Sequence, residues 1–171
     1  MEFHTEDVLE FRKIRETLAA GCTSELGRER VLNRPVATDA ETIEREYAFV
    51  GELYRLFELN QEPPTQGLRD LRPMLRRVLP RNAILEPGEL LQVAEFCHLA
   101  GRLKRYFSQQ RDEVPLLAGE ADGFVVMHDI EYHIRQAIEA NGEVADGASE
   151  TLRELRGRIR GLEARVQNTL E

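Results

Sequence analysis

Residues 148–171 restrict the possible folds of this chain more than any other stretch. Apolar residues recur there at alternating intervals of three and four; they are Leu152, Leu155, Ile159, Leu162 and Val166. This heptad spacing predicts a coiled-coil helix, whose apolar seam needs a second helix to pack against. Neither Gly nor Pro follows Val166, so the sequence stops while the helical pattern is still running.

The rest of the chain is predicted to be helical as well. Apolar residues recur at helical spacing, and Gly or Pro separates the periodic stretches. Helices are predicted over about 5–20, 24–33, 39–57, 67–79, 87–107, 114–121 and 127–139. The third carries an apolar stripe made of Ile43, Tyr47, Val50, Tyr54 and Phe57. Charged residues make up 32% of the chain, with only 12 Gly and 7 Pro, which is typical of a helix-rich globular protein. The prediction is an all-α fold.

Three parts are expected along the chain. They are a helical core or lever domain at 1–140, a short extended link at 141–148 and a coiled-coil arm at 149–171. The turn dipeptides Asn141-Gly142 and Asp146-Gly147 allow one very short β-hairpin near 142–147. Ser149 is the expected N-terminal cap of the last helix.

Composition argues against several classes of function. The formal net charge is −8, which disfavours an independent nucleic-acid binder because phosphate contacts need clustered Lys and Arg. No apolar stretch is long enough to span a bilayer, and no signal sequence is recognisable. Cys22 and Cys97 form no Cys-x-x-Cys pair. We therefore expect a cytoplasmic protein with reduced thiols and no membrane partner.

The sequence contains no motif that predicts catalysis in this chain. It has no phosphate-binding loop, no dinucleotide-binding turn and no nucleophile elbow, so we predict no catalytic, cofactor-binding or metal-binding residue. His128 and His133 are five residues apart and fall on different helix faces, so with Asp129 and Glu131 they are interpreted as ordinary polar residues. The Cys97-His98 pair is interpreted in the same way, because nothing places a second base nearby.

Arginines offer the only candidate ligand contacts. One group lies at Arg69, Arg72, Arg76, Arg77 and Arg81, against the single acid Asp70. Another lies on the terminal helix, where the candidate nucleic-acid contacts are Arg153, Arg158, Arg160 and Arg165. These side chains have two interpretations: solvated flanks that pair with a partner helix, which we favour, or phosphate contacts.

Four stretches in this order resemble the MutS-II family, the second bacterial branch of the MutS ATPases. The stretches are VLEFRKI, then TSELGRERVLNRPVATDAETIEREYAFVGELYRLF, then GLRDLRPMLRR with LEPGELLQVAEFCHLAGRLKRYF, and finally GEVADGASETLRELRGRI. In the second stretch the residues that match the MutS core signature are Thr23, Leu26, Gly27, Val31, Leu32, Pro35, Asp39 and Ile43. The mismatch-reading domain of repair MutS proteins, the ATPase phosphate loop and the Smr-type nuclease domain have no counterpart in these residues.

The resemblance implies that the chain is the N-terminal part of a longer protein. Its last helix would be the outgoing arm of an antiparallel coiled-coil clamp, with the returning arm beyond Glu171. The parent would be a homodimeric ATPase and endonuclease that uses ATP and Mg²⁺. Through it the chain would act on branched DNA, restraining homologous recombination, or on collided ribosomes, which it would split. The alternative is a stand-alone all-α interaction module that dimerises through its C-terminal helix.

Overall fold

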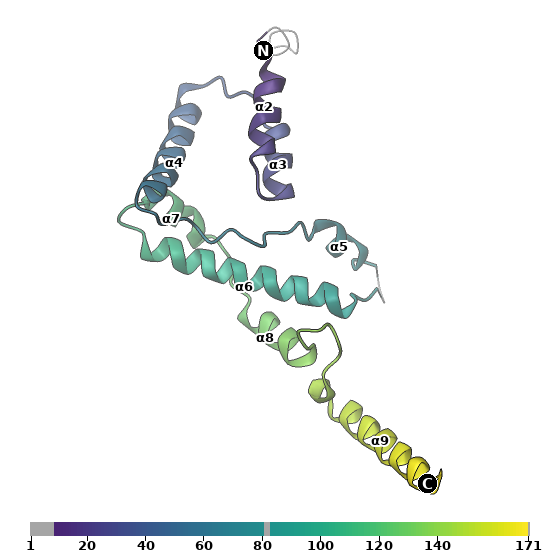
Figure 1. The fold of residues 1–171 in the computed structure, drawn as a ribbon. Coiled ribbons are helices and arrows are strands. Elements are labelled where there is room, and N and C mark those ends of the chain that lie inside the picture. Colours follow the sequence, from purple (N-terminus) through teal and green to yellow (C-terminus); the bar gives the residue numbers. More distant parts are fainter. Residues whose placement is uncertain (1–8, 81–82, 171) are drawn as a thin grey trace. The chain divides into compact units, whose positions relative to one another are not determined.

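The fold is all-α, as predicted. The computed structural model describes residues 9–80 and 83–170, and within them eight α-helices and no β-strand are present (Figure 1). The helices are α2 (Phe11–Ala20), α3 (Glu25–Leu32), α4 (Ala40–Glu58), α5 (Arg72–Arg77), α6 (Pro87–Gln109), α7 (Pro115–Asp122), α8 (His128–Ala137) and α9 (Glu150–Leu170). A 3₁₀ turn, η1 (Asp146–Ala148), precedes α9. None of the helices in the described ranges is long and apolar enough to cross a membrane.

Helix starts follow the local sequence signals. The side chains of Ser24, Asp39 and Ser149 each accept a backbone N–H from the third residue after them, at 3.1, 2.8 and 3.1 Å. The hydrogen bond from Thr42 also lowers the pKa of the Asp39 carboxyl. Pro73 and Pro87 lie in the first turns of α5 and α6, where a missing N–H costs nothing. The caps and Pro87 confirm the helix starts predicted near residues 24, 39, 87 and 149, whereas the helix predicted over 67–79 is limited to Arg72–Arg77.

Contacts divide the chain into two compact units. The first combines the described residues up to Asp70 with Leu99–Val126, and the second combines Leu71–His98 with the residues from Met127 onward. The main buried cluster belongs to the first unit. It consists of Leu56, Phe107, Val114, Ala118 and Ala121, with Leu103, Tyr106 and Leu117 packed against it. The predicted boundaries at residues 140 and 148 remain a prediction.

Helix α4 buries a different face from its apolar stripe. Amphipathic helices usually turn such a stripe to the core, yet all five stripe residues named above are exposed. The buried residues of α4 are Leu56 and Glu52. The Glu52 carboxylate accepts the backbone N–H groups of Leu116 and Leu117 at 2.9 and 2.8 Å. Glu52 therefore caps α7 from another helix, since Val114 at the N-cap provides no side-chain hydrogen bond.

In the second unit, the predicted helix over 127–139 ends earlier than expected. Helix α8 stops at Ala137, and Ile138 has the extended angles φ −131° and ψ 127°. Ile138 is buried and forms an isolated antiparallel bridge with Val144. In place of the short hairpin predicted near 142–147, the described residues form this single bridge. One of its two residues, Ile138, lies before the predicted range. The predicted Asp146-Gly147 turn is the 3₁₀ turn η1.

Candidate nucleic-acid interface

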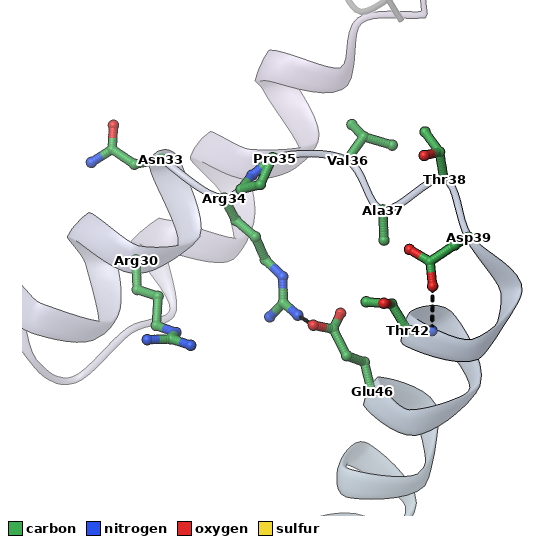
Figure 2. Close-up of a pocket in the computed structure, with 10 residues that line it drawn as sticks. All are labelled: Arg30, Asn33, Arg34, Pro35, Val36, Ala37, Thr38, Asp39, Thr42 and Glu46. Carbon is green, nitrogen blue, oxygen red and sulfur yellow. Dashed lines mark hydrogen bonds and ion pairs between the residues drawn. The ribbon is translucent and has the colours of Figure 1, made fainter.

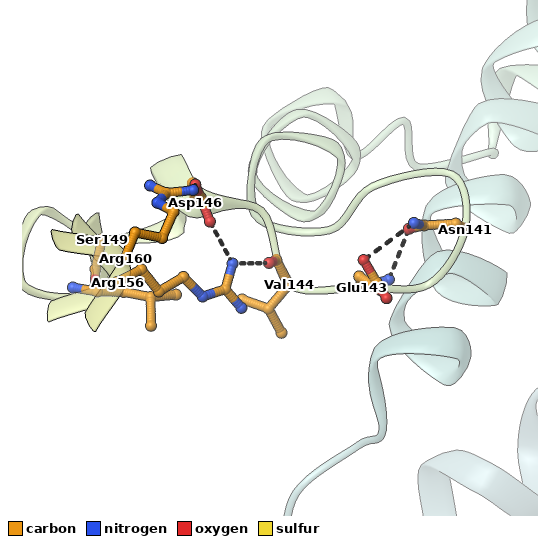
Figure 3. Close-up of polar contacts among 8 residues, drawn as sticks. Asn141, Glu143, Val144, Asp146, Ser149, Arg156 and Arg160 are labelled. Carbon is orange, nitrogen blue, oxygen red and sulfur yellow. Dashed lines mark hydrogen bonds and ion pairs between the residues drawn. The ribbon is translucent and has the colours of Figure 1, made fainter. Parts of the chain in front are cut away.

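Two arginines of α9 attach this helix to the preceding link (Figure 3). The guanidinium of Arg156 donates to Asp146 Oδ1 at 2.6 Å and to the Val144 carbonyl at 2.8 Å. Arg160 donates to Asp146 Oδ2 at 2.8 Å. Hydrogen bonds from Arg156 and then Arg160 lower the pKa of the Asp146 carboxyl. This network attaches the first three turns of α9 to the link.

The link itself turns at Asn141 and Gly142. Gly142 has a positive φ of 84°, a conformation that glycine adopts without strain. The Asn141 side chain accepts the Glu143 N–H at 2.9 Å, and the Glu139 N–H donates to the Glu143 carbonyl at 2.8 Å. These bonds bring Val144 beside Ile138, and the Val144 carbonyl is then available to Arg156.

The heptad seam of α9 is uncovered. Leu155, Ile159, Leu162 and Val166 are 47%, 53%, 58% and 59% exposed, and only Leu152 at the start is partly buried. Among the described elements, α9 packs chiefly against η1. The predicted seam therefore lies on one exposed face, and no helix of the described ranges occupies it.

The four candidate arginines of α9 differ in their surroundings. Arg160 is engaged with Asp146, and Arg153 lies against Gly147. Arg158 and Arg165 are exposed and form no ion pair with any residue that the structure describes. Sequence reasoning missed the anchoring role of Arg156. Asp146 lies ten residues earlier, and the two side chains meet only because the link bends. The nucleic-acid role of the four arginines remains a prediction.

The polar residues around α8 form structural contacts. The Nδ1 atom of His98 lies 2.9 Å from Glu131 Oε1, and Arg135 donates to the same oxygen at 3.1 Å. His133 Nδ1 lies 2.6 Å from the Asp129 carbonyl oxygen. Burial, and then the Glu131 charge, raises the pKa of the Cys97 thiol, which makes it a poor nucleophile at neutral pH. No group of three or more His, Cys, Asp or Glu side chains suited to a metal occurs in the described residues.

A polar pocket lies beside the start of α4 (Figure 2). It has a volume of about 540 Å³, and its lining includes Arg30, Arg34, Asp39 and Glu46. Arg34 is already paired with Glu46. The Asp39 carboxylate occupies the N-terminus of α4, so an anion there would meet a negative charge. This arrangement does not favour anion binding.

The fold places the chain in a general class: it is an all-α chain whose last helix has an exposed apolar face. Comparison with known proteins identifies its relatives. No model of a protein family matches the chain. Over 171 residues, all of this chain, it is 37% identical to "Endonuclease MutS2" of Symbiobacterium thermophilum. It is 33% identical over 166 residues to "Endonuclease MutS2" of Bacillus velezensis and 31% identical over 166 residues to "Putative endonuclease MutS2" of Bacillus subtilis.

These matches cover 95–100% of this chain but only 21% of each relative. The chain thus spans about one fifth of the length of these relatives. It belongs to the MutS2 family, which confirms the resemblance found in the sequence.

Proposed function

We propose that this chain is the N-terminal, non-catalytic module of a longer MutS2-type protein, comprising a helical core and the first arm of a coiled-coil clamp. The exposed seam of α9 is the observation that carries the proposal. A helix with four large apolar side chains open to water is marginal by itself, and an antiparallel returning arm would cover them. The relatives, about five times longer by their coverage, have ample chain for such an arm.

The parent protein is proposed to be a cytoplasmic homodimeric ATPase with a C-terminal nuclease domain. ATP and Mg²⁺ would bind outside the 171 residues. The name of the relatives, endonuclease, supports action on nucleic acid. The proposed clients are branched DNA, whose binding restrains homologous recombination, and collided ribosomes, which the protein would split. Both present phosphate backbones to a clamp arm.

Within α9, the proposed phosphate contacts are strongest at Arg158 and Arg165. Both are exposed and have no ion pair within the described part of the chain, so their charge is available to a ligand. Arg160 already neutralises Asp146, which reduces its value as a phosphate contact. The net charge of −8 opposes phosphate at long range, so the chain by itself is expected to bind nucleic acid weakly.

The test is binding of the full-length protein to a four-way DNA junction and to ribosomes. Arg158→Glu with Arg165→Glu should weaken binding and reduce the slope of log affinity against log salt by about two, because each phosphate contact contributes about 0.9. The matched control is Arg102→Glu with Arg105→Glu, an equal charge reversal at exposed positions of α6. Equal losses in both double variants would contradict a specific role for α9.

The proposal also makes the 171-residue chain inactive towards ATP. Its sequence has no loop that could hold the phosphates, so a purified sample should hydrolyse ATP at the buffer rate. Turnover that copurifies with the chain through several columns and disappears with a point variant in it would contradict the proposal.

The second candidate is a stand-alone all-α interaction module that dimerises through α9. The same exposed seam favours it. The two candidates differ in the reading frame downstream of codon 171. A frame that continues into a phosphate-loop motif supports the MutS2 parent, and a stop codon at or near this point supports the stand-alone module.

A further inference from the structure

Three arginines gather on one side of α9, around the 3₁₀ turn η1. Arg156 and Arg160 both donate to the Asp146 carboxylate (Figure 3). A Cβ placed on Gly147 would lie 3.5 Å from a guanidinium nitrogen of Arg153, so Arg153 lies over the same turn. Its side chain is exposed and has no ion pair within the residues that the structure describes. Three guanidinium groups thus surround a turn that contributes one carboxylate, which leaves this spot positively charged.

The two ion pairs of Asp146 differ in how firmly they are held. The Arg156 side chain is 38% exposed and donates to the Val144 carbonyl as well as to Asp146 Oδ1. The Arg160 side chain is 62% exposed, and Asp146 Oδ2 is its hydrogen-bond acceptor. Exposed ion pairs contribute little to stability, because water screens them. Arg156 therefore anchors α9 to the link, whereas Arg160 can exchange the carboxylate for another anion with little loss of stability.

Arg153 and Arg160 lie on a different side of α9 from Arg158 and Arg165. The members of each pair are seven residues apart, so each pair occupies one side of the helix. Five residues separate Arg153 from Arg158 and Arg160 from Arg165, which turns the two pairs about 140° away from each other around the helix axis. We call Arg153 and Arg160 the η1-side pair, and Arg158 and Arg165 the flank pair.

Neither pair belongs to the apolar seam, so the returning arm proposed above leaves both pairs in water. Leu155 and Leu162 follow the η1-side pair by two positions, about 160° away around the helix axis. A two-helix arm is at least about 20 Å wide, because each helix with its side chains measures about 10–12 Å across. The major groove of DNA is only about 12 Å wide. The paired arm therefore cannot enter a groove, and one straight duplex touches only one side of it.

We propose that the η1-side pair is a second phosphate-contact face of α9, and that the arm lies between two separate nucleic-acid backbones. The inference rests on the proposed nucleic-acid function of the parent protein. Guanidinium groups bind phosphate oxygens in a bidentate manner, and Glu150 and Glu163, three residues from Arg153 and Arg160, form no ion pair with them in the described structure. Two duplex segments on opposite sides of one arm occur where a nucleic acid branches. The second face therefore favours branched over linear nucleic acid.

The experiment measures the affinity of the full-length protein for a four-way DNA junction and for a linear duplex, over a series of salt concentrations. Arg153→Gln with Arg160→Gln should weaken junction binding and lower the slope of log affinity against log salt by about one to two, because each phosphate contact contributes about 0.9. Binding of this double variant to the linear duplex should equal that of the wild type. Arg158→Gln with Arg165→Gln should weaken binding to both ligands.

A single variant separates a phosphate contact from a structural role. Arg160→Gln also releases Asp146, but the exposed Arg153 side chain has no ion pair to lose in the described part of the chain. Arg153→Gln alone should therefore keep the circular dichroism of the wild type and lower the junction slope by about 0.9. The control is Arg102→Gln with Arg105→Gln, at exposed positions of α6, which should leave both affinities unchanged.

The two ligands distinguish failure of this inference from failure of the proposed function. If the η1-side double variant loses as much affinity for the linear duplex as for the junction, both pairs contact one duplex and the inference is wrong. If it loses none for either ligand, or no more than the α6 control, these arginines serve only the link, and the inference is wrong while the flank pair keeps its proposed role. A wild-type protein that binds neither ligand would overturn the inference and the proposed DNA contact together.

Discussion

Helices α4 and α9 carry the same heptad pattern and differ in what their other faces do. On α4, Leu56 is fully buried and Glu52 caps α7, so the helix belongs to the core although its apolar stripe is exposed. On α9, the seam is exposed, and the side chains of Arg156 and Arg160 bond to Asp146 of the link. The comparison teaches that an apolar heptad stripe does not by itself identify the helix face that the fold buries.

The largest contrast is expected for removal of one buried side chain. Leu56→Ala on α4 should lower the free energy of unfolding by about 2–5 kcal/mol, because it deletes a fully buried side chain and leaves a cavity. The matched variant Leu155→Ala on α9 should change it by less than about 0.5 kcal/mol, since Leu155 is half exposed. Urea denaturation followed by circular dichroism measures both. Equal losses would mean that α9 is as deeply packed as α4.

The second contrast concerns the buried carboxylate. Glu52→Ala should lower the free energy of unfolding by about 1–3 kcal/mol, because the part-buried N–H groups of Leu116 and Leu117 lose their acceptor. Glu44→Ala, at an exposed position of the same helix, serves as the control and should be nearly neutral. Hydrogen exchange should quicken at the start of α7 in the first variant only. Unchanged exchange there would show that Glu52 does not hold α7.

Glycine replacements sharpen the comparison further. A Cβ at Gly51 of α4 or Gly161 of α9 would meet nothing within 4 Å, and Ala is favoured over Gly in helices by about 0.8–1 kcal/mol. Gly51→Ala should raise the urea midpoint, since α4 unfolds with the core. Gly161→Ala should increase helical signal without moving that midpoint. A midpoint shift for Gly161→Ala would mean that α9 unfolds together with the core.

The smallest effect is expected at the base of α9. Hydrogen bonds from Arg156 and Arg160 depress the pKa of Asp146 below its ordinary value of 3.8. A carboxyl with a depressed folded-state pKa stabilises the fold above its unfolded pKa and loses that contribution as pH falls through the folded pKa. Hence acidification below about pH 3.8 should fray the first turns of α9, and Asp146→Asn should abolish this pH dependence.

Nuclear magnetic resonance shifts of the Arg156 and Arg160 side chains measure this transition. Asp129→Asn, at an exposed position of α8, is the control for the loss of one carboxylate. An acid transition at Arg156 that persists in Asp146→Asn would show that another group holds the base of α9.

Most helix starts were predictable because their signals are local. Ser24, Asp39 and Ser149 bond to the third residue after them, and Pro73 and Pro87 act through their own φ angles. The α9 seam was predictable for the same reason, since its five positions share one helix. Residues 5–8 of the first predicted helix, Val8 included, lie outside the described residues, and residues 9 and 10 form a turn before α2 begins at Phe11.

The remaining features depend on residues far apart in sequence. Ile138 continues the helical pattern of Ile130 and Ile134, but its bridge to Val144 and its burial remove it from α8. Glu52 looks like any surface acid until the N-terminus of α7, more than sixty residues later, supplies two N–H groups to it. Neither partner is visible from the spacing around the residue itself.

By itself, the sequence determined the all-α class, most helix boundaries, the α9 seam and the relationship to the MutS2 family. Backbone hydrogen bonds, caps and heptads act within a few residues, so they can be read along the chain. Only the tertiary structure decided that α4 buries Leu56 and Glu52 in place of its stripe, and that Asp146 accepts hydrogen bonds from Arg156 and Arg160 at the base of α9. These outcomes depend on residues distant in sequence, which pack against Leu56 and donate hydrogen bonds to the buried Glu52 carboxylate. Those contacts exist only in the folded protein.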